Sequence, residues 1–409
     1  MSANKHAKKA STPSLWRTLF QPRGSLDRVL LFLVVAFILF GILMVFSASA
    51  PWAIKEKQDP NFVVKRDLVW GVLSILAMGV VSRIPFSFYR RYAFGLYALS
   101  LLLCLLCFAP IIGAPTNNAH RWIGYKAVTL MPSDYLKISS VMVLAAFFTK
   151  GGGASLSMGK RFLLILVFAG VTLLPIIKQP NFSAVVVIGA TIIAVYFMAG
   201  MKWPEMIVWG ILIVLALLVA FWPREGNYRL TRLLVMLDPF RDPLNEGWQL
   251  LQSLFAVSTG RLFGVGFGMS RQKFDYLADE PHNDFIFAVL CEELGFVGAL
   301  LFILLYAYMI YRMIQNVRKN PDPFSRLLGF GLTFIIAFQA LVNIGVSIGF
   351  VPPTGITLPF ISYGGSSLLA VSVMMGMILQ LSRTPASSVH RVRPKKHWRK
   401  PASEVIDNG

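Results

Sequence analysis

Apolar segments alternate with short polar stretches along most of the chain, and ten of them can be marked. Each is close to the length of about 20 residues that a helix needs to cross a bilayer. Residues 178–181 alone separate the fifth segment from the sixth, which predicts a tight helical hairpin. The ten segments span residues 29–46, 68–81, 92–112, 133–148, 162–177, 182–199, 206–222, 285–310, 327–350 and 361–381. The pattern predicts an all-α polytopic membrane protein with ten transmembrane helices.

Basic residues are concentrated in alternate connections, which gives the predicted protein an orientation. They precede the first segment, fill every second connection and recur after the last segment. Because Lys and Arg accumulate in cytoplasmic loops, both termini are predicted to be cytoplasmic. The regions are then a basic N-terminal tail (1–28), a membrane domain (29–382) and a basic C-terminal tail (383–409). The one large extracytoplasmic loop is 223–283, where apolar residues from Trp248 to Phe255 at helical spacing predict an amphipathic helix on the outer leaflet.

Composition agrees with this topology and limits the range of partners. The 409 residues are 56% hydrophobic and only 14% charged, too few charges to cover the surface of a soluble protein. The formal net charge of +20 is typical of nucleic-acid binding proteins as well. Since the basic residues follow the positive-inside pattern, membrane orientation explains them, and we expect no nucleic-acid partner.

Asp284 is the last residue before the eighth apolar segment and follows a charged, glycine-rich part of the large loop. Two interpretations of this residue remain open. Asn283 and Asp284 are ordinary N-cap residues for a helix that starts at Phe285. A carboxylate at that place is also available as a base, although the helix dipole stabilises its charged form and lowers its basicity.

Other polar residues lie in or next to apolar segments. Glu292 and Glu293 fall about two turns into the eighth segment, where a structural ion pair with a basic residue of another span is the favoured interpretation and a substrate-facing role the alternative. Asp134 and Lys137, three residues apart, are expected to pair with each other. Arg121 is either an interfacial anchor or a phosphate contact. Residues 352–367 are rich in Pro, Gly, Ser and Thr, which is tolerated at membrane depth where the backbone lines a cavity.

Several motifs together identify a family. They are RWI (121–123), PSDYLK (132–137), DPLNEGWQLLQSL (242–254), FGVGFGMSRQK (263–273), HNDFIFAVLCEELG (282–295) and TGITLPFISYGGSSLL (354–369). In this order they make the chain resemble the SEDS family of shape, elongation, division and sporulation proteins. The loop and the last motif are more similar to the division and sporulation members than to the elongation member.

The resemblance implies a peptidoglycan glycosyltransferase that polymerises lipid II at the outer face of the bacterial cytoplasmic membrane. A GlcNAc hydroxyl would attack the anomeric carbon of MurNAc with inversion, and undecaprenyl pyrophosphate would leave. Asp284 matches the aspartate that the family holds essential, and it would act as the general base. Basic side chains or a divalent cation such as Mg²⁺ or Mn²⁺ would stabilise the pyrophosphate; no metal ligands are assigned. The expected substrate-binding residues are Arg121, Lys178, Gln179, Arg261, Lys273, His282 and Ser366.

The resemblance also implies partners and a location. These are a cognate class B penicillin-binding transpeptidase, other divisome proteins and the division septum. The chain departs from the family at Asn181, where an aspartate is usual, and in an acidic segment that is one residue longer, so that Asp279 and Glu280 compete for one position. Two other functions remain as alternatives: a lipid II flippase that binds the same headgroup, and a non-catalytic scaffold for the transpeptidase.

Overall fold

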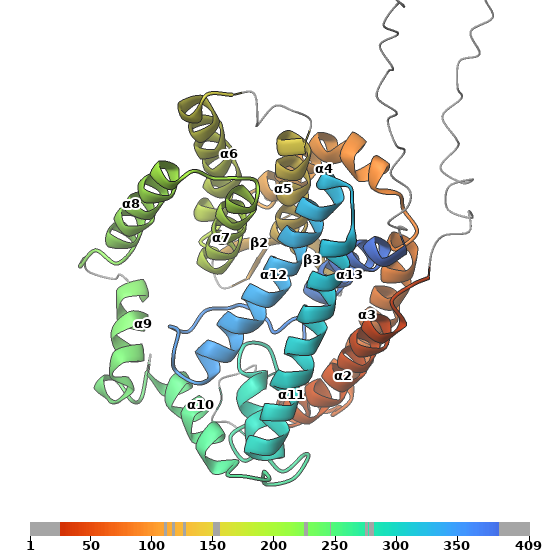
Figure 1. The fold of residues 1–409 in the computed structure, drawn as a ribbon. Coiled ribbons are helices and arrows are strands. Elements are labelled where there is room, and N and C mark those ends of the chain that lie inside the picture. Colours follow the sequence, from red (N-terminus) through yellow and green to blue (C-terminus); the bar gives the residue numbers. More distant parts are fainter. Residues whose placement is uncertain are drawn as a thin grey trace, which may run out of the picture.

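Long apolar helices dominate the computed structural model, and each of the ten predicted segments falls on one of them (Figure 1). The structure describes residues 25–109, 113–116, 119–125, 128–149, 156–224, 228–245, 247–274, 277 and 282–383. Most of both predicted tails, and the pair Asp279 and Glu280, lie outside these residues. The ten helices are α2 (Arg28–Lys57), α3 (Phe62–Val81), α4 (Phe86–Leu106), α5 (Pro132–Thr149), α6 (Met158–Lys178), α7 (Phe182–Met198), α8 (Trp203–Ala220), α11 (Ile286–Lys319), α12 (Pro323–Ser347) and α13 (Gly365–Arg383).

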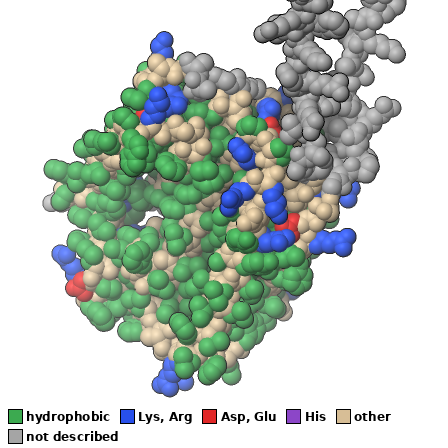
Figure 2. Space-filling view, in the orientation of Figure 1, with side chains coloured by type: hydrophobic (Ala, Val, Ile, Leu, Met, Phe, Trp, Pro, Cys, Tyr) green, Lys and Arg blue, Asp and Glu red, His purple; other side chains and the backbone are tan. Residues whose placement is uncertain are grey.

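The protein is a multi-pass membrane protein. Among the described residues, six helices are each long and apolar enough to cross a bilayer: α2, α6, α8, α11, α12 and α13. Helices α3 and α4 pass that test together but are bent by 116° where they meet, and α7 is a shorter apolar helix. Hydrophobic side chains cover most of the face drawn in Figure 2, and several basic side chains gather at its upper right. The count of ten spans and the cytoplasmic termini stay predictions.

Helix α5 lies inside the bundle, which explains how it can carry the charged residues Asp134 and Lys137. Fourteen of its 18 residues are buried, and it packs against α4, α7 and α12. Lys137 Nζ lies 2.7 Å from Asp134 Oδ1, with both side chains almost inaccessible to solvent. The predicted pairing of these two residues is confirmed. A helix that faces other helices can carry such a pair, because the neighbouring helices shield these two side chains from lipid.

Helix α8 lies at the edge of the bundle and is held mainly at its first turn. Only Glu205 and Trp209 of its 18 residues are buried. The Glu205 carboxylate accepts two hydrogen bonds from the Arg161 guanidinium, at 2.7 and 2.9 Å, and one from the Tyr196 hydroxyl at 2.7 Å. This buried group joins α6, α7 and α8 at one end, while the rest of α8 presents an apolar surface.

The connection between α4 and α5 contains a small β-sheet that the sequence interpretation missed. Strands β1 (Gly113–Thr116), β2 (Ala119–Tyr125) and β3 (Val128–Leu130) form an antiparallel sheet in chain order. Ile123 pairs with Gly113 on one side and with Leu130 on the other. The connection is therefore partly ordered as a sheet, and Arg121 lies on its central strand β2.

The large loop contains the predicted helix, but that helix packs on the bundle. The loop holds α9 (Tyr228–Leu237), a 3₁₀ turn η1 (Pro239–Arg241) and α10 (Trp248–Thr259). Helix α10 contacts α11 and α12 and buries Leu250, Leu251 and Ser253 against them. The Ser253 hydroxyl donates a hydrogen bond to Ser347 O at 2.8 Å. The apolar spacing thus marks a helix whose apolar face contacts protein.

Candidate active site

Helix α11 is broken at Gly295, and the break produces a short helix that leads away from Asp284. Gly295 has φ 68° and ψ −172°, a backbone conformation that only glycine adopts easily. The first part of α11, residues 286–294, is almost entirely buried. A Cβ on Gly295 would lie 2.2 Å from Gly264 N, so glycine is also required by close approach of the outer loop.

Residues of the outer loop form hydrogen bonds with the backbone N–H and C=O groups that the break leaves without helical partners. Residues 261–266 run beside the break and make four backbone hydrogen bonds with it. These join Val265 N to Glu292 O (3.0 Å), Gly266 N to Glu293 O (3.1 Å), Phe296 N to Arg261 O (2.8 Å) and Val297 N to Leu262 O (3.0 Å). Buried backbone groups without partners are costly, so this segment replaces the missing helical turn and locks the short helix to the loop.

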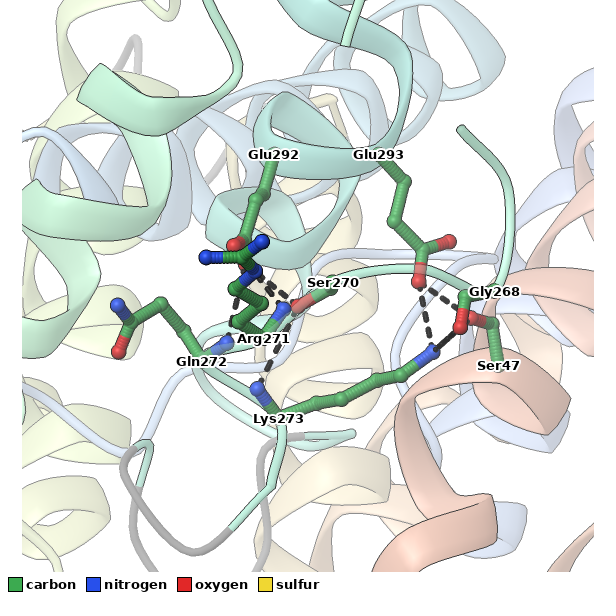
Figure 3. Close-up of polar contacts among 8 residues, drawn as sticks. All are labelled: Ser47, Gly268, Ser270, Arg271, Gln272, Lys273, Glu292 and Glu293. Carbon is green, nitrogen blue, oxygen red and sulfur yellow. Dashed lines mark hydrogen bonds and ion pairs between the residues drawn. The ribbon is translucent and has the colours of Figure 1, made fainter. Parts of the chain in front are cut away.

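A buried ion pair, which we call the Lys273 cluster, lies under the break (Figure 3). Lys273 Nζ donates to Glu293 Oε1 at 2.9 Å, to Ser47 Oγ at 3.0 Å and to Gly268 O at 2.7 Å. The Ser47 hydroxyl donates to the same carboxylate oxygen at 2.5 Å. All three ammonium hydrogens are therefore engaged within the protein, and the loop, α11 and α2 are tied together.

Glu292 holds the preceding part of the loop by a different set of contacts, also seen in Figure 3. Its carboxylate accepts hydrogen bonds from the Ser270 hydroxyl at 2.5 Å, from Arg271 N at 3.0 Å and from Gln272 N at 3.3 Å. The structural interpretation of Glu292 and Glu293 is confirmed by these contacts. The basic partner of Glu293, Lys273, lies in the outer loop, however, and not in another span as expected.

Asp284 lies at the N-terminal end of the short helix and is only partly buried. Helix α11 begins at Ile286 and Phe285 occupies the N-cap position, one residue later than expected, so capping does not explain the aspartate. The side-chain amide of Asn343 on α12 donates to Asp284 O at 2.9 Å and to Ile356 O at 2.8 Å. A Cβ at Gly355 would lie 3.7 Å from Asp284 Oδ2, which shows that the carboxylate faces this loop. The backbone that carries Asp284 is therefore fixed from two sides.

Two arginines from distant parts of the chain lie at the same end. A guanidinium nitrogen of Arg121, on β2, donates to Pro180 O at 2.5 Å, and one of Arg232, on α9, donates to Pro353 O at 2.9 Å. Burial lowers the pKa of Arg121, and the charge of Arg232 acts in the same direction, while Asp284 and Tyr228 oppose them. The charge of Arg121 therefore feels both Arg232 and Asp284, and Arg232 and Asp284 both face the loop that contains Pro353 and Gly355. Arg232 was not among the substrate-binding residues expected from the sequence.

His282 is buried and packs between two aromatic rings close to Asp284. Its ring centroid lies 5.7 Å from that of Trp52 and 5.3 Å from that of Tyr363. Its backbone carbonyl accepts a hydrogen bond from Tyr363 N at 3.0 Å. Burial lowers the pKa of His282 to about 4, so the imidazole is neutral at pH 7. Its geometry is that of a packing residue that joins α2, the start of α11 and the loop before α13.

The remaining residues expected to bind substrate are spread over several environments. The amide of Gln179 is buried and donates to Cys104 O at 2.7 Å, and Ser366 Oγ accepts from Met131 N at 2.9 Å. Lys178 and Arg261 are exposed. For Lys273 the expected phosphate contact finds no support in this arrangement, since its ammonium is buried and fully engaged. The structure thus brings Arg121 and Asp284 together, and adds Arg232.

A divalent cation has no evident site among the described residues. No group of three or more His, Cys, Asp or Glu side chains there is close enough to hold a metal ion. Among the described residues, the charge of Arg121 acts on Asp284, and a guanidinium repels cations. Asn181, at the position where the related motif has an aspartate, accepts a hydrogen bond from Ala184 N at 3.2 Å and caps α7. The donor set of this site suits an anion.

Comparisons with known proteins agree with the motifs. The model of the family described as cell cycle proteins, which comprises FtsW, RodA and SpoVE, matches residues 27–386. Stage V sporulation protein E of Bacillus subtilis is 36% identical over 361 residues, covering 88% of this chain and 98% of that protein. A probable peptidoglycan glycosyltransferase FtsW of Trichlorobacter lovleyi is 36% identical over 356 residues, covering 87% and 93%.

Solved structures show the same architecture. A chain of a peptidoglycan synthase complex that coordinates polymerisation and crosslinking superposes with a TM-score of 0.73 at 27% identity, covering 88% of this chain and 98% of that chain. The rod shape determining protein RodA of Thermus thermophilus superposes with a TM-score of 0.64 at 25% identity, covering 88% and 97%.

Proposed function

We propose, from the premise that the chain belongs to the family of cell cycle proteins FtsW, RodA and SpoVE, that it is a glycosyltransferase that polymerises lipid II into peptidoglycan strands. Peptidoglycan glycosyltransferase is the activity in the names of several relatives. The observation that carries the proposal is the grouping of Asp284, Arg121 and Arg232 at one end of the bundle. One carboxylate beside two guanidiniums supplies a base and a binding site for a diphosphate.

The carboxylate of Asp284 acts as the general base. The 4-hydroxyl oxygen of a GlcNAc acceptor forms a bond to the anomeric carbon of MurNAc, and the bond from that carbon to the pyrophosphate oxygen breaks with inversion. The hydroxyl proton passes to Asp284. A positioned base contributes typically 10²–10⁴-fold to such a step. Partial exposure lets the carboxylate meet the hydroxyl, whereas Glu292 and Glu293 are buried and hydrogen-bonded to residues of the protein.

Arg121 and Arg232 stabilise the departing undecaprenyl pyrophosphate. Guanidiniums bind phosphate oxygens through paired N–H groups, and these interactions strengthen as negative charge develops on the leaving group. Both arginines are already oriented by backbone carbonyls, Pro180 O and Pro353 O. The site therefore needs little reorganisation when the charge appears. We expect Arg121→Gln or Arg232→Gln to reduce the rate of polymerisation more than the binding of lipid II.

The contacts around the short helix of α11 hold Asp284 in position for this reaction. Asp284 precedes a short helix whose far end is held by the loop at the Gly295 break and by the Lys273 cluster. Its backbone is fixed by Asn343. A base must be held within a few tenths of an ångström of its productive position, and a buried helix provides this better than a free loop.

A cognate class B penicillin-binding transpeptidase is the proposed partner, and the division septum the proposed location. A similar chain comes from a complex that couples polymerisation to crosslinking. Relatives over nearly the whole chain are named for division or sporulation. The strands made by this protein would be crosslinked by that transpeptidase at the outer face of the membrane.

A flippase for lipid II is the second candidate, because α11 is broken inside an apolar helix, a feature that transporters use at their binding sites. The break is closed by the outer loop, and the charged site lies at the helix end. A non-catalytic scaffold for the transpeptidase would need neither the broken helix nor the charged site.

The experiment is the incubation of purified protein and its transpeptidase with lipid II in vesicles, with glycan strands separated on a gel. We expect long strands from the native protein, none from Asp284→Ala, and native amounts from Asp238→Asn, which changes an exposed aspartate of the same loop. Movement of lipid II across vesicles without polymer would instead support the flippase. Equal polymer from Asp284→Ala would support the scaffold.

A further inference from the structure

A cavity lies near the end of α11 that is far from Asp284. It is a cavity of about 600 Å³ where α5, α7 and α11 end and α12 begins. Its walls are mostly apolar, and two basic side chains, Arg318 and Arg326, line it as well. We propose that this cavity binds an anionic phospholipid, with the phosphodiester held by Arg318 and Arg326. This site is separate from the proposed active site.

The two arginines differ from Arg312 and Arg90, which lie at the same end of the bundle. Arg312 is paired with Asp27 at 2.7 Å, and Arg90 with Asp322 at 2.6 Å. Among the described residues, Arg318 and Arg326 each have no carboxylate within ion-pair distance. Both are exposed, so their guanidiniums can turn to an incoming group. A phosphodiester supplies the missing negative charge, and its oxygens match the fork of a guanidinium.

The apolar part of the cavity suits an acyl chain. Phe148, Met198, Ile314 and Leu327 form walls from four different helices. Phe330 lines the cavity and begins a row of rings along α12, with centroids of Phe330 and Phe334 6.5 Å apart.

The row continues toward the middle of the helix. Phe334 and Phe338 are stacked, with centroids 5.5 Å apart and planes 10° from parallel, and all three rings are only partly buried. An acyl chain that leaves the cavity can lie along this row while its headgroup stays with the arginines.

The positive charges of Arg318 and Arg326 favour an anionic lipid over a protein helix as the occupant of the cavity. A membrane-spanning helix of a partner would cover the apolar wall, but it would leave two guanidiniums without an anion at the edge of the membrane. Basic pockets between transmembrane helices are typical sites for anionic lipid headgroups. The size of the cavity falls in the range of about 300–1,000 Å³ that is usual for small-molecule sites.

The test compares retention of phosphatidylglycerol and phosphatidylcholine by the detergent-purified full chain, measured by native mass spectrometry. We expect the native protein to prefer phosphatidylglycerol. The double variant Arg318→Gln, Arg326→Gln should lose this preference, by about fivefold for each arginine removed. The variant Ala199→Phe fills the cavity and keeps both arginines, so it should also lose bound phosphatidylglycerol while its unfolding temperature stays near the native value.

The matched control removes two exposed charges from the same end of the bundle without touching the cavity. Arg28 follows Asp27, which pairs with Arg312, and Lys160 lies in the first turn of α6. The double variant Arg28→Gln, Lys160→Gln should keep the native preference. An equal loss in this control, an unchanged preference in the Arg318, Arg326 variant, or displacement of phosphatidylglycerol by the partner's membrane helix would each overturn the proposal.

Discussion

Lys273 Nζ lies 2.9 Å from Glu293 Oε1, and neither side chain is more than 3% exposed. The pair links the glycine-rich part of the outer loop to the short helix that begins just after Asp284. Its position makes it a support for the proposed base, because it holds the end of that helix opposite to the aspartate.

Removal of one partner of this pair should destabilise the protein strongly. Glu293→Gln leaves the ammonium of Lys273 without its counter-charge in a buried place, and such losses cost about 3–5 kcal/mol. This loss of stability is measured as the change in the free energy of unfolding in detergent. The control is Lys65→Gln, which breaks the exposed pair with Asp59 at 2.8 Å and should leave the free energy of unfolding almost unchanged, because solvent screens an exposed pair. Similar small losses in both variants would refute the support role.

The break in α11 should tolerate no side chain at Gly295. Gly295→Ala places a Cβ 2.2 Å from Gly264 N and 2.6 Å from Leu262 O, and it also strains a positive φ. We expect little folded protein, or a loss of unfolding free energy of more than about 2 kcal/mol. Gly170→Ala is the matched control, since its Cβ meets nothing within 4 Å in α6. That variant should be as stable as the native protein or slightly more so. A stable Gly295→Ala protein would contradict the geometry described for the break.

His282 should make stability depend on pH. Burial lowers the pKa of His282 to about 4, below the usual value of 6.5, so between these values the unfolded state binds a proton that the folded state does not. Stability should therefore fall as pH falls from about 6.5 to 4, by at most about 3 kcal/mol. His282→Phe keeps a ring between Trp52 and Tyr363 and removes the proton site. The slope of unfolding free energy against pH should shrink in this variant, and an identical slope would show that other groups cause it.

The helices could be predicted from the sequence because each coincides with a long apolar segment. Every predicted segment falls on a helix, and the hairpin at residues 178–181 is confirmed. The sheet β1–β3 was missed because its strands are short and carry no alternation of apolar and polar residues that marks a buried face. The break at Gly295 was missed as well, because a single glycine inside an apolar run does not distinguish a continuous helix from an interrupted one.

The site was predictable only in part. The position of Asp284 before a helix and its motif indicated this residue, and the roles of Asp284 and Arg121 stay predictions, although the charge of Asp284 does act on Arg121. Arg232 carried no signal, because contacts between α9 and the loop before α13 depend on tertiary folding. Lys273 had the charge expected of a phosphate ligand, yet the buried acid opposite it is 20 residues away in sequence and gives it a structural partner.

The central claim is that the carboxylate of Asp284 accepts the proton of the acceptor hydroxyl. The most direct measurement is the rate of glycan polymerisation by Asp284→Asn, under conditions where its unfolding temperature and its binding of lipid II equal those of the native protein. The amide keeps the size and polarity of the side chain but cannot take a proton at neutral pH. We expect the rate to fall at least about 100-fold. A rate within a few-fold of the native one would contradict the assignment of Asp284 as the base.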